Sequence, residues 1–556
     1  MNFRLTKGNF LKTGAYIEGD SAVFTFAAEK EDECSIVLLD KSGNTACVID
    51  IPAEYSTGSL YSVRLHGFCG NEYAYYFRIN GKRCIDPYAT RIFGREKWND
   101  KTRSDNDYEI ACGIDSSDFD WKYDSFPEIT RDRMKLYKLH VRGFSMDVSG
   151  DKKHKGTFEA VSDRINYIKK LGFTSILLMP VYEFEEMTIP VKHDIPEYAK
   201  PKYSLKDEQS VHTENDKVNF WGYTSGNYFA VKASYASDAS DASNELRRLV
   251  ERLHKNGMEC IVEMYFPDRT DHNLILDALR YWVMSFHVDG FKLLGDRLPV
   301  TAIVQDALLS RTKILYDGFD MSVVPQNRTY ENLYIDKEEY QFAARMMLNH
   351  INCNMYELLN QQKKQGENVG FINYISSNNG FTLSDLFMYN DRHNEANGEK
   401  NADGPSWNFS NNYGCEGPSR KRFIREIRKL KWKDAMLLLF LAQGVPMIMA
   451  GDEICNSQDG NNNAYCQDNP TGWVNWSNEH SRRENIRFLT RLIKFRDEHP
   501  VISCPKPFKF SDYKAVGYPD LSYHCKNAWI GECDATKLCV GVMYCGDYNE
   551  VNKDYV

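Results

Sequence analysis

Short apolar segments separated by polar turns dominate the first part of the chain. Ala22–Phe26 and Ser35–Leu39 are examples, and no helical period is sustained over residues 1–125. This pattern predicts a small β-sandwich. The last segment, 501–556, has short strand-like stretches again, and we interpret it as a short or truncated C-terminal β-domain.

The central segment, 126–500, alternates strands with helices. Its strands, for example Ser175–Val181 and Val288–Leu294, are mostly apolar on both faces, which is typical of parallel strands covered by helices. About eight such strands are expected, although the sixth gives no clear signal. We therefore predict an α/β fold, a (β/α)8 TIM barrel. A doubly wound sheet is the alternative, but no glycine-rich phosphate loop follows the first strand.

Composition and charge exclude several partners. The net charge is -9 and basic runs such as Arg420–Arg422 are short, so we expect no nucleic-acid ligand. The longest apolar run, Ala435–Gly451, contains Gly444 and Pro446, so it predicts a buried helix and strand and no membrane span. The 15 cysteines form no Cys-x-x-Cys pair, and the N-terminus shows no secretory signal. We expect reduced thiols, a cytoplasmic location, and neither a metal nor a cofactor.

Several motifs resemble those of one family. They are Asp86–Ala89, Leu139–Phe144, Asn219–Tyr223, Val288–Phe291, His393–Glu399, Gly451–Glu453 and Gly460–Asn469. Together these segments resemble the isoamylases and bacterial glycogen-debranching enzymes of the α-amylase clan, glycoside hydrolase family 13. The resemblance implies a barrel with its site at the carboxyl ends of the strands, preceded by a carbohydrate-binding-like β-sandwich. It also implies retaining hydrolysis of α-1,6 branch points by an Asp nucleophile, a Glu acid and a third Asp.

All three carboxylate positions implied by this resemblance are altered. Leu294 stands at the nucleophile position, and Lys292 replaces the arginine that supports the nucleophile in the family. Asp317 stands at the acid position with one methylene group fewer than glutamate. Asn378 and Asn379 replace the family's His-Asp pair after the seventh strand. Because leucine cannot form a glycosyl ester and asparagine carries no charge, the family's covalent route has no nucleophile here.

These changes predict a catalytically inactive homologue, a pseudoenzyme, that binds α-glucan or maltooligosaccharide. Its protein partner would be an active debranching enzyme or a second copy of the chain. Asp268, which replaces a histidine of the family, belongs to the same set of changes. One alternative is an active α-1,6-glucan hydrolase or transglycosylase with a rebuilt site, in which Asp317 pairs with Asp296 or Asp268. The other alternative is an interaction protein that binds no sugar.

A glucan-binding surface is expected from aromatic and polar positions. These are Tyr182, Trp221, Tyr223, Asn378, Asn379, Asn394 and Glu395. Trp221 and Tyr223 match the sugar-stacking segment of the family, whereas Tyr182 stands where the family has a different polar contact. Core packing of the aromatic rings, and internal hydrogen bonds in the loop that contains Asn394 and Glu395, are the alternatives to sugar contact.

Overall fold

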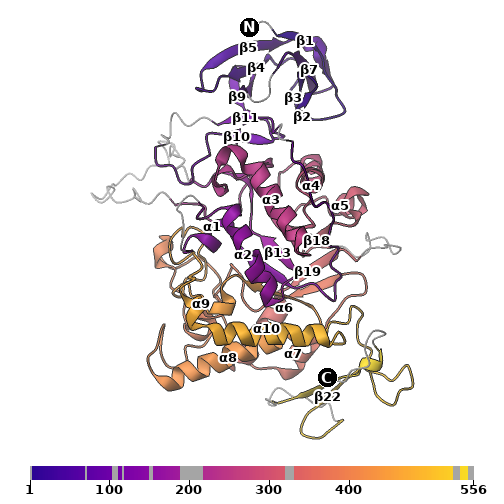
Figure 1. Cartoon of the computed structure of the whole chain (residues 1–556), viewed down its shortest axis with the longest axis vertical. Helices are drawn as coiled ribbons and strands as arrows, with labels where there is room; N and C mark the ends of the chain where they lie inside the picture. Colours follow the sequence, from indigo (N-terminus) through magenta and orange to yellow (C-terminus); the bar gives the residue numbers. More distant parts are fainter. Residues whose placement is uncertain are drawn as a thin grey trace, which may run out of the picture. The chain divides into compact units, whose positions relative to one another are not determined.

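The computed structural model describes residues 3–68, 72–102, 110–115, 118–148, 154–187, 217–319, 331–529 and 539–548. The chain, traced in Figure 1, forms two compact units. The first unit comprises Met1–Ser116, Tyr182–Ser234 and Tyr465–Asp468. The second comprises Ser117–Val181, Tyr235–Ala464 and Asn469–Val556.

The first unit contains two antiparallel sheets. One sheet has the order β1 (Arg4–Lys7), β7 (Leu60–His66), β3 (Ser21–Ala27) and β2 (Gly14–Glu18), with β6 (Ser56–Thr57) beside β7. The other has the order β10 (Arg91–Phe93), β11 (Ala111–Gly113), β8 (Ala74–Ile79), β4 (Cys34–Leu39) and β5 (Thr45–Ile51), with β9 (Lys82–Cys84) beside β8. A separate pair joins β14 (Tyr182–Phe184) to β15 (Gly226–Val231). The predicted N-terminal β-sandwich is therefore confirmed.

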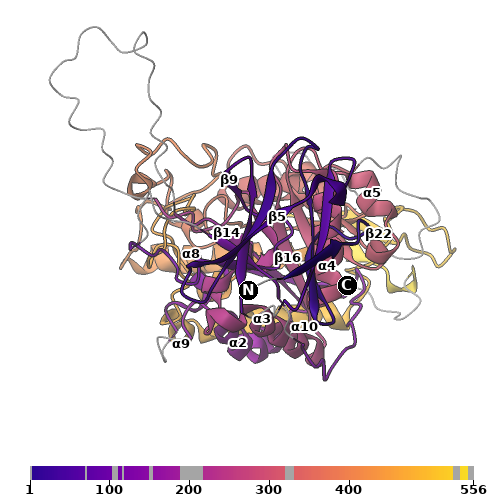
Figure 2. The same cartoon turned by 90° about the horizontal axis from the view of Figure 1, so that it is seen from above.

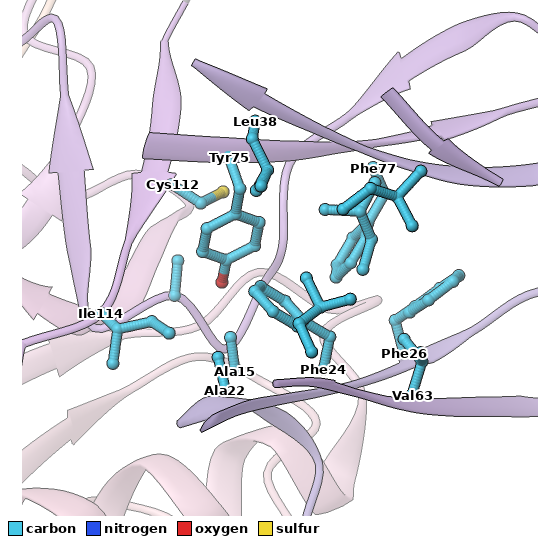
Figure 3. Close-up of a cluster of buried hydrophobic side chains, with 14 of the residues drawn as sticks. Ala15, Ala22, Phe24, Phe26, Leu38, Val63, Tyr75, Phe77, Cys112 and Ile114 are labelled. Carbon is cyan, nitrogen blue, oxygen red and sulfur yellow. The ribbon is translucent and has the colours of Figure 1, made fainter. Parts of the chain in front are cut away.

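Aromatic side chains from both sheets build the core of this unit (Figure 3). The rings of Phe24 and Tyr75 meet edge to face at 5.0 Å, and Phe26 stacks on Phe77 at 4.1 Å. The Tyr75 hydroxyl donates a hydrogen bond of 2.7 Å to the carboxyl of Asp86, and both groups are buried. Burial raises the pKa of Asp86 to about 6. The Asp86–Ala89 motif thus has a structural role, because its first residue satisfies a buried tyrosine hydroxyl.

Eight parallel strands close into a barrel in the second unit. In order they are β12 (Leu136–Leu139), β13 (Ser175–Leu178), β16 (Glu259–Tyr265), β17 (Gly290–Leu294), β18 (Lys313–Leu315), β19 (Leu333–Lys337), β20 (Gly370–Asn373) and β21 (Val445–Met449). The barrel prediction is confirmed. The sixth strand, which the hydrophobic pattern did not reveal, is β19.

The helices of this unit follow the chain order of the strands. They are α1 (Val141–Ser145), α2 (Phe158–Leu171), α3 (Ala242–Lys255), α4 (His272–Phe286), α5 (Val300–Gln305), α6 (Glu338–Asn349), α7 (Met355–Gln362), α8 (Arg422–Phe440), α9 (Asn478–Ser481) and α10 (Arg483–Glu498). Helices α2 and α3 pack side by side, and α10 also contacts α2 (Figure 2). A hairpin of β22 (Leu521–His524) and β23 (Gly541–Tyr544) lies near the end of the chain.

Two elements end earlier than their apolar patterns predicted. The apolar run Met134–Phe144 by itself predicts one long strand, but β12 ends at Leu139 because His140 caps a short helix, its Nδ1 accepting from the Gly143 amide at 3.0 Å. The pattern of Glu339–Gln362 by itself predicts a single helix. It is divided because His350 takes the left-handed φ of 57° and ends α6. Local capping and backbone conformation therefore decided both boundaries.

Two further observations on the described residues concern membrane-spanning helices and the state of the cysteines. Within them, no helix is long and apolar enough to cross a bilayer. Twelve described cysteines are free thiols, as expected, whereas Cys525 is disulfide-bonded, so the expectation of reduced thiols is wrong at that position.

Candidate active site

Two layers of side chains occupy one face of the barrel strands. The apolar layer includes Leu136, Leu177, Ile261, Leu315, Tyr334, Ile372 and Val445. Because side chains alternate along a strand, residues two positions further share the same face. These include Lys138, Glu263, Asp317 and Asp336, which stand at or just beyond the carboxyl ends of their strands. This end of a barrel is where active sites form.

Two lysines and two carboxylates of this polar layer form a network. The Lys138 ammonium lies 2.6 Å from the Glu263 carboxylate and donates a hydrogen bond of 2.8 Å to the side-chain oxygen of Asn378. The Lys292 ammonium contacts the Asp336 carboxylate and lies 3.9 Å from Glu263. These partners come from β12, β16, β17 and β19. The network therefore balances its charges across strands that are distant in sequence.

Burial acts differently on the two lysines. It lowers the pKa of Lys138, and the opposing attraction of Glu263 does not restore it. Burial also lowers the pKa of Lys292, but Asp336 and Glu263 together overcome it, so the pKa is raised overall. Lys292 therefore stays cationic beside the Asp336 side chain. Lys292 thus keeps the positive charge of the arginine that the family has at this position, but its ion-pair partner is Asp336.

Asp317 keeps a carboxyl group at the acid position. Its side chain is exposed to solvent just beyond β18. Desolvation by the surrounding chain and the charge of Asp336 raise its pKa, against the opposing effects of Lys292 and of a hydrogen bond from the Asp336 amide. A carboxyl with a raised pKa remains protonated at higher pH, which suits a proton donor.

Asp296 lies within electrostatic reach of the same region. Burial raises the pKa of the Tyr316 hydroxyl, and the charges of Asp296 and Asp317 raise it further. That hydroxyl donates a 3.3 Å hydrogen bond to the Gly295 carbonyl. Asp296 and Asp317 thus both act on one phenol, whereas Asp268 is exposed in the turn that follows β16.

The remaining altered positions carry no acid. Leu294 is the last residue of β17, is half-buried, and accepts a 2.8 Å hydrogen bond from the Phe266 amide through its carbonyl. Asn379 is exposed, and its carbonyl accepts from the Ser377 hydroxyl at 3.0 Å. The amide side chain of Asn379 is therefore available for a sugar hydroxyl.

The expected stacking residues lie in the first unit. Tyr182 is fully buried, and its hydroxyl donates to the carbonyls of Thr224 and Gly222 at 2.8 and 3.2 Å. Trp221 is also buried, whereas Tyr223 is half-buried and meets the Trp221 ring edge to face at 6.1 Å. Core packing thus accounts for Tyr182 and Trp221, and Tyr223 keeps an accessible face.

Internal hydrogen bonds hold the loop after the seventh strand. Asn394 is buried, and its amide donates to the Asp403 carbonyl and to the side-chain oxygen of Asn462, each at 2.8 Å. The Asn462 amide donates back to the Asn394 side chain at 2.9 Å. Glu395 is exposed in a short 3-10 helix. Asn394 therefore joins the loops after β20 and β21, while Glu395 keeps its carboxylate in solvent.

Sequence reasoning missed Lys138 and Asp336 as members of the site. A charged residue within an otherwise apolar strand was the available signal, since such a charge is buried only with a partner. Lys138 is such a charged residue in the strand Leu136–Leu139, and Asp336 is one in the strand Leu333–Lys337.

The chain has recognisable relatives among known proteins. Residues 148–274 match the family model described as alpha amylase, catalytic domain. Chloroplastic isoamylase 1 of Arabidopsis thaliana is 28% identical over 538 residues, covering 79% of this chain and 66% of that protein. The glycogen debranching enzyme of Enterobacter sp. (strain 638) is 27% identical over 590 residues, covering 90% and 86%. The chain thus spans just under two thirds of the length of isoamylase 1.

Solved structures share the fold at low identity. The catalytic module of the glycogen-degrading pneumococcal virulence factor SpuA has a TM-score of 0.68 at 17% identity, covering 96% of this chain and 87% of that one. A pullulanase from Paenibacillus barengoltzii, in complex with maltohexaose and alpha-cyclodextrin, has a TM-score of 0.62 at 18% identity, covering 88% and 81%.

These matches correct the prediction that the chain is not an enzyme. The relatives that align with most of its length are named isoamylases and glycogen-debranching enzymes. The pseudoenzyme interpretation rested on the changes at all three carboxylate positions, and an active hydrolase with a rebuilt site was its alternative. Hydrolysis by direct attack of water needs an acid and a base but no covalent intermediate, and Asp317 still supplies a carboxyl group with a raised pKa.

Proposed function

We propose that this chain, a homologue of isoamylases and glycogen-debranching enzymes with an alpha-amylase catalytic domain, hydrolyses α-glucans through a rebuilt acid–base site. The observation that carries the proposal is the position and environment of Asp317. Its carboxyl is accessible at the carboxyl end of the barrel, and desolvation and Asp336 raise its pKa. Such a group can hold a proton and transfer it to a glycosidic oxygen.

The second carboxylate in the proposal is Asp296. The Tyr316 hydroxyl donates to the Gly295 carbonyl, and Asp296 and Asp317 directly follow Gly295 and Tyr316 in the chain, so both carboxylates follow this link between the segments after β17 and β18. Asp317 donates its proton to the leaving oxygen as the glycosidic bond breaks. Asp296 accepts a proton from water, whose oxygen bonds to the anomeric carbon. Because no covalent ester forms, the product has the inverted configuration, in contrast to the retention implied by the family resemblance.

The substrate class in the proposal is a branched α-glucan. The named relatives are debranching enzymes, and the pullulanase neighbour was solved with maltohexaose. Asn379 and Asn378 are the proposed contacts for sugar hydroxyls, since amides donate and accept hydrogen bonds. Within the first unit taken by itself, Tyr223 is a proposed position for sugar stacking.

Location and protein partners stay predictions. The twelve free thiols favour the cytoplasm, a reducing compartment. Assembly with an active debranching enzyme or with a second copy is untested.

Release of reducing ends from glycogen and pullulan tests the proposal. We expect Asp317→Asn to lower turnover by at least about 100-fold, the usual contribution of a general acid. Asp296→Asn should lower turnover while glucan affinity is kept. Asp120→Asn, which changes an exposed aspartate before the first barrel strand, serves as the matched control and should keep full activity.

NMR of the first-formed sugar anomer separates the possible outcomes. Inversion supports the proposed use of water. Equal turnover by wild type and Asp317→Asn, or no turnover by a folded wild-type protein that binds glucan, contradicts the hydrolase proposal.

A further inference from the structure

A groove of about 890 Å³ lies between α2 and α10, apart from the barrel residues described above. Its walls come from Asp163–Leu171 on α2, from Trp476–His480, and from Arg483–Thr490 on α10. This volume lies in the usual range of small-molecule pockets, roughly 300–1,000 Å³. No role in α-glucan hydrolysis has been assigned to these residues.

The carboxylates of the groove are already engaged by arginines. Glu479 lies 3.0 Å from the guanidinium of Arg164. Asp163 lies 3.7 Å from the guanidinium of Arg252. Because both carboxylates are paired with arginines, they repel an anion bound in the groove less than unpaired carboxylates would.

Two exposed cations of the groove are not engaged in this way. Lys170 and Arg483 are both exposed, and the structure records no ion pair for either among the residues it describes. Arg483 is also the first residue of α10, and the preceding Arg482 makes no side-chain cap bond there. The amide groups and dipole of a helix N-terminus favour an anion at that point. Lys170 and Arg483 thus give the groove a positive rim in a chain whose net charge is -9.

The floor of the groove is rigid and partly apolar. The indole of Trp476 donates a 2.6 Å hydrogen bond to the Phe144 carbonyl, and Arg164 covers its ring at 4.3 Å. The Tyr167 hydroxyl donates to Glu453 at 3.1 Å. Ile486, which is half-buried, adds aliphatic surface beside these fixed rings. A ligand with a small organic body as well as a charged group therefore fits both parts of the groove.

We propose that this groove binds a small organic phosphate monoester. Its phosphate lies between Lys170 and Arg483, and its organic body lies on the floor near the half-buried Tyr167 and Ile486. A guanidinium forms two parallel bonds to phosphate oxygens, and an ammonium adds a point charge. A nucleic acid would need a longer cationic track than these two side chains supply.

Isothermal titration of the full chain with glucose 1-phosphate tests this inference, with glucose and inorganic phosphate as comparison probes. We expect saturable binding of glucose 1-phosphate, weaker binding of inorganic phosphate, and none of glucose. Lys170→Ala/Arg483→Ala should weaken the affinity at least tenfold, since two charged contacts are lost. Lys169→Ala, which removes a neighbouring exposed lysine bonded at 3.4 Å to Asn256, should leave the affinity unchanged.

Several results would overturn the inference. Without saturable binding of glucose 1-phosphate there is no site. Equal affinities for inorganic phosphate and glucose 1-phosphate would mean an adventitious ion only. An unchanged affinity in the double variant, or an equal loss in Lys169→Ala, would place the ligand elsewhere. Because the readout is binding, failure of the hydrolase proposal does not affect it.

Discussion

A single residue, Leu294, decides which glycosidic chemistry the barrel can support. Its side chain follows Lys292 on the same face of β17, and it offers no oxygen to a sugar carbon. Lys292 meanwhile contacts Asp336, an acid on another strand. The nucleophile position has therefore lost its charge while its cationic neighbour has kept an anionic partner.

Leu294→Asp is expected to change the stereochemistry of the reaction. The new carboxylate lies two residues from the Lys292 cation and can form a glycosyl ester, so the product should keep the substrate's configuration. Placing a charge at this half-buried position should lower the free energy of unfolding by roughly 1–3 kcal/mol. NMR of the first-formed anomer gives the answer. Leu294→Asn is the control for shape, and retention by that variant would exclude the ester route.

The sequence located the altered residues but not their contacts. Leu294 was found because it follows the Val288–Phe291 motif, and Asp317 and Asn379 were found from the family patterns at the ends of the fifth and seventh strands. The network of Lys138 and Asp336 escaped because its members lie far apart in the chain, and no local pattern records a pairing across strands. Only the structure distinguishes the two tyrosines: Tyr182 is buried and its hydroxyl bonds within the protein, whereas Tyr223 is partly accessible.

Among the elements, the segment after the eighth strand is held by buried acids. Glu453 accepts hydrogen bonds from the hydroxyls of Tyr137 and Tyr167 at 2.9 and 3.1 Å, and from the Gly451 amide at 3.0 Å. Burial, reinforced by the charge of Asp452, raises its pKa from 4.5 to about 7. The folded protein thus binds this proton more tightly than the unfolded chain does.

The raised pKa of Glu453 predicts that stability falls as pH rises from about 4.5 to 7. In that window the unfolded chain has released the proton and the folded protein still holds it. The shift corresponds to a loss on the order of 3 kcal/mol above the folded pKa. Urea unfolding across this range should show a steeper decline for wild type than for Glu453→Gln. Glu426→Gln, at an exposed position of α8, is the control, and equal slopes for wild type and Glu453→Gln would contradict the prediction.

At the scale of the whole molecule, most of the architecture was predictable. The change from period two to alternating strands and helices placed the β-sandwich and the barrel without any tertiary information. The sixth strand was not predictable, because β19 ends in the charged residues Asp336 and Lys337, which interrupt its apolar pattern. One of these charged residues, Asp336, belongs to the polar layer of the barrel.

The polar layer also predicts how the barrel responds to loss of one charge. Lys292→Met removes the cation beside Asp336 and Glu263, whose side chains are 10% and 0% exposed. Breaking a buried pair from one side typically costs about 3–5 kcal/mol, because the remaining charge has no partner. Lys292→Met/Asp336→Leu removes both charges and should be more stable than the single variant.

Urea unfolding of both variants, together with Asp336→Leu, completes a double-mutant cycle. We expect strong coupling between positions 292 and 336, because each charge is tolerated in the barrel only while the other is present. Lys337→Met is the matched control on the same strand. Its ammonium lies 3.9 Å from the exposed carboxylate of Glu339 and 4.1 Å from the centre of the Phe371 ring, so its loss should cost about 1–2 kcal/mol. If the losses at 292 and 336 simply add, the two side chains are stabilised independently and the network does not join the strands.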